Sequence, residues 1–264
     1  MKKNKFKFYH TFVIPTVNKS QYLEFCLKSL KKQKIKSNII ITTAKPFVGI
    51  RKFAKKYNVK LIIFNKHKNI ANDWNRAIRS SKSNYVTIAH QDDIYNKNYL
   101  YEVKKSLRKI NNKKPAIIFT DYYELKNNKK NISLKLLIKR LILFIFYYKK
   151  NLIHKKNIKK KFVSFGSPIS CPSVTFNNQY NIRFDEKFWI NIDWNLWINL
   201  SETNGSFLYI KKKLVGHRIH NKSETSRAIK DGKREKEDWI LFNKLWPKPI
   251  AFILCKLYKL SYKN

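Results

Sequence analysis

A short apolar run ends at two adjacent carboxylates in Ser83-Asn84-Tyr85-Val86-Thr87-Ile88-Ala89-His90-Gln91-Asp92-Asp93-Ile94-Tyr95. The segment from Tyr85 to Ala89 predicts a buried strand, because it is β-branched and aromatic and too short for a helix. Asp92 and Asp93 then lie at its carboxyl end, where open α/β sheets bind ligands, and paired carboxylates there suit a divalent cation and a phosphate. Asp also favours turns for local reasons, so this stretch alone leaves both interpretations open.

Strand-like and helix-like patterns alternate around this stretch. Leu23, Cys26, Leu27 and Leu30 have the spacing of an amphipathic helix, and a capping-box pattern predicts that this helix begins at Asn18. The alternation predicts a parallel sheet with helices on both faces. The expected strands are 8–14, 38–42, 59–64, 85–89 and 116–120, followed later by 174–176 and 207–210, and the helices between the early strands lie near 18–30, 48–57 and 70–78.

The composition fits one large α/β domain or one domain with a small appendage, because the chain has 264 residues of which 43% are hydrophobic. Its formal net charge of +42 would ordinarily indicate nucleic acid or an anionic membrane as partner. However, Lys is spread along the whole chain beside abundant Asn and Ile, and no zinc-finger or helix-turn-helix pattern occurs. We interpret the charge mainly as compositional drift, and nucleic-acid binding stays as an alternative rather than the expected activity.

The cysteines and the N-terminal residues indicate the compartment. Cys26, Cys171 and Cys255 are too far apart for a metal-binding pattern or a disulfide framework, so a reducing compartment fits best. The basic residues 1–7 are followed by an apolar stretch that polar residues and a proline interrupt, which excludes a signal peptide and a spanning helix. We therefore expect the protein to face the cytoplasm.

The segment 132–148 is strongly apolar but contains Lys135, Lys139 and Arg140. Its longest uncharged run, 141–148, is much shorter than the roughly 20 residues that span a bilayer. It is either a helix in the membrane interface, with its basic side chains reaching toward head groups, or a helix packed on the domain. Basic flanking residues favour the interface. The apolar tail 250–262 allows the same two interpretations.

Asp193 lies in a segment rich in tryptophan, beside Trp189, Trp194 and Trp197. Burial among these rings would disfavour the charged carboxylate and raise its pKa toward the range useful to a general base. A simple helix-capping role is compatible with that chemistry. Upstream, residues 165–173 are rich in Gly, Ser and Pro, which lets the backbone approach a ligand closely, with ordinary loop packing as the alternative.

Polar side chains are dense in the segment 217–225. Two histidines, an arginine and two hydroxyl groups within nine residues suit phosphate oxygens or a metal ion. A single histidine is usually structural, whereas this density favours a site. The side chains concerned are those of His217, Arg218, His220, Ser223 and Thr225.

Five motifs together resemble those of the family 2 glycosyltransferases of the GT-A fold, most closely the bacterial members that build surface polysaccharides. Each motif alone is weak, but their order along residues 8 to 226 is specific. They are the opening strand and turn Phe12-Val13-Ile14-Pro15-Thr16-Val17-Asn18, the helix Asp73-Trp74-Asn75-Arg76-Ala77-Ile78, the DXD-like Gln91-Asp92-Asp93, the base position Asp193-Trp194, and the closing motif His217-Arg218-Ile219-His220 with Ser223 and Thr225.

The resemblance implies a GT-A (Rossmann-like) α/β fold with a mostly parallel sheet and a nucleotide-diphospho-sugar donor. It also implies a divalent cation, Mn²⁺ or Mg²⁺, on the donor's diphosphate and an inverting hexosyl transfer to a hydroxyl of a glycan or lipid-linked acceptor. Such a cation acts as a Lewis acid on the leaving group. The expected process is the synthesis of cell-surface polysaccharide.

The resemblance also assigns residues to roles. Asp193 is the expected catalytic base, Asp92 and Asp93 are the expected metal ligands, and His220 is an additional candidate ligand. The expected donor-binding and nucleotide-binding residues are Pro15, Thr16, Asn18, Thr43, Asn75, Gln91, Asp92 and Arg218.

Two positions depart from the family pattern. The acidic pair that usually follows the second strand is replaced here by Ile41-Thr42-Thr43-Ala44, so the identity of the base is open. His90 stands where the DXD-like motif begins with an acidic residue. An inactive relative that still binds sugar nucleotides is therefore a further alternative.

The expected organisation is a GT-A domain over residues 1–226, with an amphipathic insertion at about 130–160, and a C-terminal helical extension over residues 227–264. The apolar helices predict a protein on the inner face of the cell membrane, with peripheral contact to anionic lipid.

Overall fold

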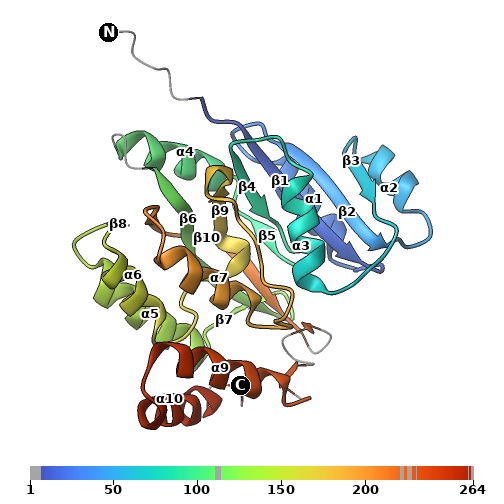
Figure 1. Cartoon of the computed structure of the whole chain (residues 1–264). Coiled ribbons are helices and arrows are strands. Elements are labelled where there is room, and N and C mark those ends of the chain that lie inside the picture. Colours follow the sequence, from blue (N-terminus) through green and yellow to red (C-terminus); the bar gives the residue numbers. More distant parts are fainter. Residues whose placement is uncertain are drawn as a thin grey trace.

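The computed structural model describes residues 7–110, 114–220, 223–224, 228–229, 231–260 and 262. A central sheet of mostly parallel strands is flanked by helices (Figure 1), which confirms the expected fold class. Its strands run in the order β3-β2-β1-β4-β9-β6-β10-β5, with β7 beside β6 and β8 beside β10. The strands are β1 His10–Val17, β2 Asn38–Lys45, β3 Lys60–Ile63, β4 Tyr85–Ile88, β5 Ile94–Tyr95, β6 Pro115–Lys126, β7 Lys129–Asn131, β8 Leu152–Ile153, β9 Val174–Asn177 and β10 Ser206–Ile219.

The sheet separates two apolar cores, because successive side chains of a strand point to opposite faces. Val13 of β1 belongs to one core, while its neighbours Phe12 and Ile14 belong to the other. Helices α3, α6, α7, α9 and α10 contribute to the first core, α1, α2 and α4 to the second, and α5 to both. The helices are α1 Leu23–Lys31, α2 Ile50–Lys56, α3 Ile70–Arg79, α4 Tyr99–Lys109, α5 Leu134–Tyr147, α6 Lys156–Val163, α7 Ile192–Ser201, α9 Lys233–Leu245 and α10 Lys248–Leu260.

The strand directions bring distant segments to one edge of the sheet. β1 pairs in parallel with β2 and β4, so the residues that follow these three strands meet. The short strand β9 runs antiparallel between β4 and β6, and β6 pairs in parallel with the long strand β10. The carboxyl end of β10 therefore reaches the turn that follows β4.

The first helix begins later than the capping-box pattern predicts. Asn18 has a positive φ of 60°, and its backbone N–H donates to the carbonyl of Lys45, so it closes the turn after β1. Helix α1 begins at Leu23 without a side-chain cap, and Ser20 Oγ accepts from the N–H of Tyr22. The expected start at Asn18 was wrong, because the contact with β2 fixes the turn.

Both apolar helices of the second half pack on the domain with one face and expose apolar side chains on the other. In α5, Leu136, Leu143 and Tyr147 are buried while Phe144 and Ile145 are exposed. Helix α10 docks through Tyr258, which packs against Gly166 so closely that a Cβ there would lie 2.6 Å from Cε2 of the ring. Within the described residues, no helix has both the length and the apolar character to cross a membrane.

Candidate active site

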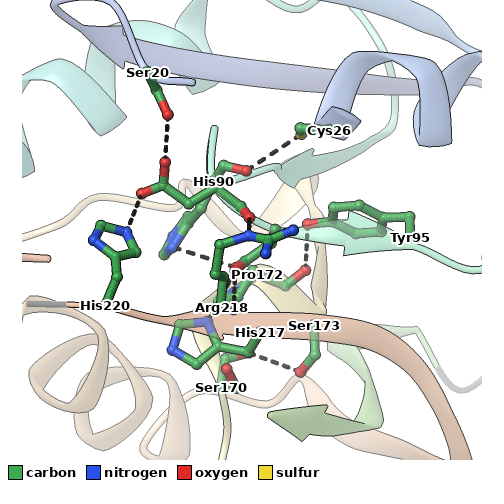
Figure 2. A network of polar contacts seen from close by, with 12 residues as sticks. Ser20, Cys26, His90, Tyr95, Ser170, Pro172, Ser173, His217, Arg218 and His220 are labelled. Carbon is green, nitrogen blue, oxygen red and sulfur yellow. Dashed lines mark hydrogen bonds and ion pairs between the residues drawn. The ribbon is translucent and has the colours of Figure 1, made fainter. Parts of the chain in front are cut away.

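Asp92 lies in the turn after β4, between side chains from two other parts of the chain. Its carboxylate accepts a hydrogen bond from Ser20 Oγ at 2.7 Å and lies 3.2 Å from Nε2 of His220. Figure 2 shows this chain of contacts, with Ser20 reaching from the β1–α1 loop and His220 from the segment after β10. About a quarter of the Asp92 side chain remains exposed, so the carboxylate is accessible to a ligand.

Asp93 is turned inward and is 1% exposed. Nδ1 of His217 lies 3.1 Å from both carboxylate oxygens, and the backbone N–H of Arg218 donates to one of them at 2.8 Å. Burial alone would raise the pKa of Asp93, but the charge and hydrogen bond of His217 outweigh it and hold that pKa below its ordinary value. The two neighbouring carboxylates therefore differ: Asp92 faces solvent, whereas Asp93 ties β10 to the β4 turn.

Arg218 connects three segments while being only 7% exposed. Its Nε donates to the backbone carbonyl of Asp92 at 3.0 Å, and its Nη1 donates to Oδ1 of Asn128 at 2.5 Å. The guanidinium also lies over the ring of Tyr22, 4.2 Å from the centroid, an arrangement that favours a cation. Arg218 thus fixes the β4 turn and places positive charge beside it.

His90 occupies the position where the family pattern has an acidic residue. Its ring lies 4.9 Å from that of Trp74, and Nε2 is buried with no hydrogen-bond partner in the part of the chain that the structure describes. Burial lowers the pKa of His90, and the carboxylates of Asp93, Asp92 and Asp193 oppose that shift. His90 is therefore a buried imidazole whose charged form is disfavoured by burial and favoured by the charges of three acidic side chains.

Asp193 lies in the first turn of α7 and faces the same region as Asp92 and Asp93. Its charge acts on both His90 and Lys139, and the charges of Asp92 and Asp93 act on His90 as well. The carboxylate accepts a hydrogen bond from the N–H of Trp194 at 2.7 Å. The three carboxylates thus converge on His90, although their segments lie 100 residues apart in the sequence.

The expected burial of Asp193 among tryptophans was wrong. Asp193 is partly exposed, whereas Trp194 and Trp197 point away into the core and Trp189 is 54% exposed. Neighbouring positions of a helix lie about 100° apart, so Trp194 does not cover the Asp193 carboxylate. What keeps Asp193 in place is the fixed start of its helix.

A carboxylate of α9 holds the start of α7, a contact that local sequence patterns did not reveal. Glu237 accepts backbone hydrogen bonds from Trp189, Ile190 and Asn191 at 2.6, 3.0 and 2.8 Å. Next to it, Asp238 accepts from Nδ2 of Asn191 at 2.6 Å. Orphan N–H groups at a helix start prefer a negative partner, so this pair fixes the turn that presents Asp193.

Four of the eight expected donor-binding and nucleotide-binding residues lie at the carboxyl ends of β1 and β2. Pro15 is paired with Thr42 and Thr16 with Thr43, and the hydroxyl of Thr16 donates to the carbonyl of Thr42. Asn18 follows in the exposed turn. These residues form a polar sheet edge that leads toward Asp92, as the parallel register requires.

Two further expected residues, Asn75 and Gln91, differ in what they contact. Asn75 is 2% exposed and uses its side-chain oxygen and nitrogen on the backbone of Phe184, so it joins α3 to that loop. Gln91 is partly exposed, and its buried Oε1 has no hydrogen-bond partner within the described ranges. Ser223 is described, whereas Thr225 of the closing motif lies outside the described residues.

The side chains at Asp92 are compatible with a divalent cation, although no group of three or more His, Cys, Asp or Glu side chains forms a metal centre in the described part of the chain. Asp92 offers an accessible carboxylate and His220 an imidazole. Asp93 is already engaged by His217 and Arg218. Cations that neutralise a diphosphate need only one or two protein carboxylates, because the phosphates supply the other ligands.

The model of the family described as Glycosyl transferase family 2 matches residues 11–174. None of the curated proteins matches the sequence. Among solved structures, S. aureus TarS residues 1–349 in complex with UDP-GlcNAc aligns with a TM-score of 0.65 at 13% identity, covering 96% of this chain and 72% of that chain. Mannosyltransferase PcManGT from Pyrobaculum calidifontis, in complex with GDP-Man and Mn²⁺, aligns with a TM-score of 0.65 at 11% identity, covering 97% and 70%. At these identities the likeness shows the fold.

Proposed function

Because the chain belongs to glycosyl transferase family 2, we propose that it moves a hexose from a nucleotide-diphospho-sugar to a hydroxyl of a glycan or lipid-linked acceptor, with inversion at the anomeric carbon. The observation that carries this proposal is the convergence of Asp92, Asp93 and Asp193 on His90. Bound UDP-GlcNAc and GDP-Man in structures of the same fold support a donor of this class.

The donor side of the site consists of Ser20, Asp92, Asp93, His217, Arg218 and His220. We propose that Pro15, Thr16, Asn18 and Thr43 line the nucleotide pocket next to it. Asp92 and His220 would hold a divalent cation, which supplies Lewis-acid stabilisation of the leaving diphosphate when bound. Asp93 acts as a positioning residue, because its oxygens already bind His217 and the backbone of Arg218.

Asp193 performs the proton transfer in this proposal. The acceptor oxygen attacks the anomeric carbon as the bond from that carbon to the diphosphate oxygen breaks. The proton of the attacking hydroxyl passes to the Asp193 carboxylate, and the bonding electrons leave with the nucleoside diphosphate. One displacement inverts the anomeric configuration, and no covalent enzyme intermediate forms.

Nucleotide-sugar binding tests this function directly. A panel of nucleotide sugars with Mn²⁺ or Mg²⁺ should raise the melting temperature for one donor, since a ligand at about 100 times its Kd stabilises the folded state by about 2.7 kcal/mol. Asp92→Ala should abolish the metal-dependent part of this shift. Asp193→Ala should keep the shift and lose turnover. If no donor stabilises the wild-type protein, or Asp92→Ala binds as well as wild type, the proposal fails.

We further propose that α5 and α10 bring the enzyme to an anionic membrane surface, where lipid-linked precursors of cell-surface polysaccharide are built. Both helices expose apolar side chains, and Lys149, Lys150, Lys155 and Lys156 lie beside the end of α5. Basic residues near an anionic leaflet each contribute about 1 kcal/mol. The exposed apolar side chains are Leu134, Leu137, Ile138, Leu141, Phe144 and Ile145 on α5 and Ile250, Phe252, Ile253, Leu257 and Leu260 on α10.

Vesicle flotation tests the membrane contact. The protein should float with vesicles containing phosphatidylglycerol and stay behind with pure phosphatidylcholine. Replacing Phe144 and Ile145 with Ser should abolish flotation, whereas replacing the exposed Val48, on a loop between β2 and α2, should leave it unchanged. Equal binding of the double variant and the wild type would contradict this contact.

A further inference from the structure

Lys135 and Lys139 lie one helical turn apart on α5 and share one face of that helix. Both side chains are partly covered, and neither ammonium has a carboxylate within 4.0 Å among the residues that the structure describes. The next residue, Arg140, is different: its guanidinium pairs with Asp121 at 3.2 Å and donates to the carbonyl of Tyr122. Two half-buried lysines that lack an ion pair among the described residues therefore lie beside an arginine that has one.

These lysines lie next to the candidate active site. Nζ of Lys139 is 5.7 Å from the centroid of the Tyr122 ring, and that ring is 6.0 Å from the ring of His217, which binds Asp93. The charge of Asp193 acts on Lys139, and the charges of both lysines act on His217. The lysines thus border the region between Asp193 and the donor side.

A third cation approaches this region from α9. Arg234 is 7% exposed, lies 3.5 Å from Asp238, and acts electrostatically on both Lys135 and Asp193. Asp238 in turn binds Asn191 at the start of α7. Figure 1 shows α5, α7 and α9 in the same half of the molecule, away from α2 and β3. We call Lys135, Lys139, Arg234 and Asp193 the acceptor side of the site.

The fold holds these cations at an electrostatic cost. Burial, together with the charges of Arg234 and Lys139, lowers the pKa of Lys135 to about 7. Burial also lowers the pKa of Lys139 to about 8, against the opposing effect of Asp193. Groups with strongly shifted pKa values are common at functional sites. A bound anion beside the two lysines would stabilise their charged forms and so raise their pKa values again.

We propose that Lys135 and Lys139 bind a phosphate group of the acceptor, beside the hydroxyl that Asp193 deprotonates. The acceptor is therefore one that carries a phosphate group close to the attacking hydroxyl. This inference rests on the proposed function and specifies its acceptor class. Lysine binds phosphate as a point charge. Two ammonium groups one helical turn apart can pair with the two negative charges of a phosphate monoester, or with the single charges of two neighbouring phosphodiesters.

The placement favours the acceptor over the donor's diphosphate. The donor's phosphates belong next to Asp92 and His220 in the proposed function, at the carboxyl end of β4. Lys135 and Lys139 share their electrostatic environment with Asp193, Arg234 and Asp238 of α7 and α9, and also with Glu124 of β6 and His217 of β10. A phosphate held there would lie near Asp193, the proposed base for the attacking hydroxyl.

Phosphate binding to the nucleotide-loaded enzyme tests the proposal. With saturating UDP or GDP and Mn²⁺, inorganic phosphate and glycerol 3-phosphate should bind to the wild-type protein without displacing the nucleotide. The double variant Lys135→Gln, Lys139→Gln should bind them about tenfold more weakly or worse, as expected when two charged contacts are lost. Its nucleotide affinity should be unchanged. The control Lys149→Gln, Lys150→Gln, at exposed positions just beyond α5, should behave like wild type.

The outcomes separate the possible sources of phosphate. If phosphate competes with the nucleotide, or the Gln variant loses nucleotide affinity, the lysines serve the donor and the inference is overturned. Unchanged phosphate binding in the Gln variant also overturns it. A wild-type protein that binds no nucleotide contradicts the proposed function instead. In transfer assays, the Gln variant should lose more activity toward a phosphate-bearing oligosaccharide than toward the phosphate-free counterpart.

Discussion

The donor side and the acceptor side of the site differ in how their charges are balanced. On the donor side, Asp93 is enclosed by His217 and the backbone of Arg218, and Asp92 lies between Ser20 and His220. On the acceptor side, Lys135 and Lys139 have no ion pair within the described ranges. On the donor side the protein itself supplies partners for both carboxylates, whereas we propose that a ligand supplies the partners of the two lysines. Charged groups that the protein already holds in place can position a substrate. Charged groups without an opposite charge beside them favour a substrate of opposite charge over others.

The largest expected effect is a fall in kcat without a change in donor affinity, which distinguishes the acceptor side from the donor side. Asp193→Asn removes the proton acceptor but keeps the size of the side chain, so kcat should fall about 10²- to 10⁴-fold, the range for loss of a general base. The Kd of the nucleotide sugar, measured by calorimetry, should not change. A raised donor Kd with little loss in kcat would place Asp193 on the donor side and break the comparison.

The two sides should also respond oppositely in stability. His217→Asn leaves Asp93 buried beside a weaker partner, and the free energy of unfolding should fall by about 3 kcal/mol, as for a broken buried ion pair. Lys139→Gln removes a cation that the fold disfavours at pH 7, so stability should rise slightly, by about 0.5 kcal/mol after allowance for solvent screening. Urea unfolding at pH 7 measures both. A loss of stability in Lys139→Gln would show that the acceptor side is already balanced.

The loss of stability at low pH is best tested at a residue outside both the donor side and the acceptor side. His10, at the start of β1, is 4% exposed, and burial lowers its pKa to about 3. The unfolded chain takes up a proton near the ordinary value of 6.5 and the folded chain does not, so stability is lost as the pH falls from 6.5 toward 3. The loss between pH 7.5 and pH 5 should be about 2 kcal/mol, at 1.36 kcal/mol per pKa unit.

The variant His10→Gln should remove this part of the acid dependence in urea unfolding curves measured at several pH values. The exposed His154→Gln serves as the matched control and should keep the wild-type slope. If His10→Gln also abolishes an acidic loss of donor binding, then that loss belongs to the scaffold and not to the histidines of the donor side. An unchanged slope in His10→Gln would rule out His10 as the source.

The smallest expected effect concerns the fine alignment of the donor side. Ser20→Ala removes one hydrogen bond to the Asp92 carboxylate, and such a bond contributes about 1 kcal/mol, or about a fivefold weaker donor affinity in the presence of Mn²⁺. Ser29→Ala, on the same helix region but bonded to the backbone of Cys26 and to Tyr95, is a control for general loosening. A larger loss in Ser29→Ala would mean that stability, not alignment, limits donor binding.

The strands and turns that carry the donor-side residues could be predicted from the sequence, because their signals are local. The strand before His90, the turn at Asp92 and the polar ends of β1 and β2 each follow from short patterns of apolar and turn residues. The motif at 217–220 was also visible as a polar cluster. What remained hidden was the pairing of Asp93 with His217, because it depends on β10 extending to Ile219 beside β6.

The acceptor side could be predicted only in part. Asp193 was found from its motif, but its environment was not, because helix geometry turns Trp194 and Trp197 away from it. The roles of Lys135 and Glu237 depend on contacts between segments that are far apart in sequence and carry no motif. Such contacts are set by packing, which a single sequence does not display.

Helix α7 is fixed at both of its ends by groups that touch no substrate. At its carboxyl end, the buried ammonium of Lys159 donates to the carbonyls of Leu200, Thr203 and Gly205. At its start, Glu237 of α9 accepts the three amide groups that precede Asp193. A fragment that ends at residue 226 would keep every acidic group of the proposed chemistry. It would lack Glu237, and those three amide groups would lose their hydrogen-bond acceptor. An active fragment of this enzyme must therefore extend through α9.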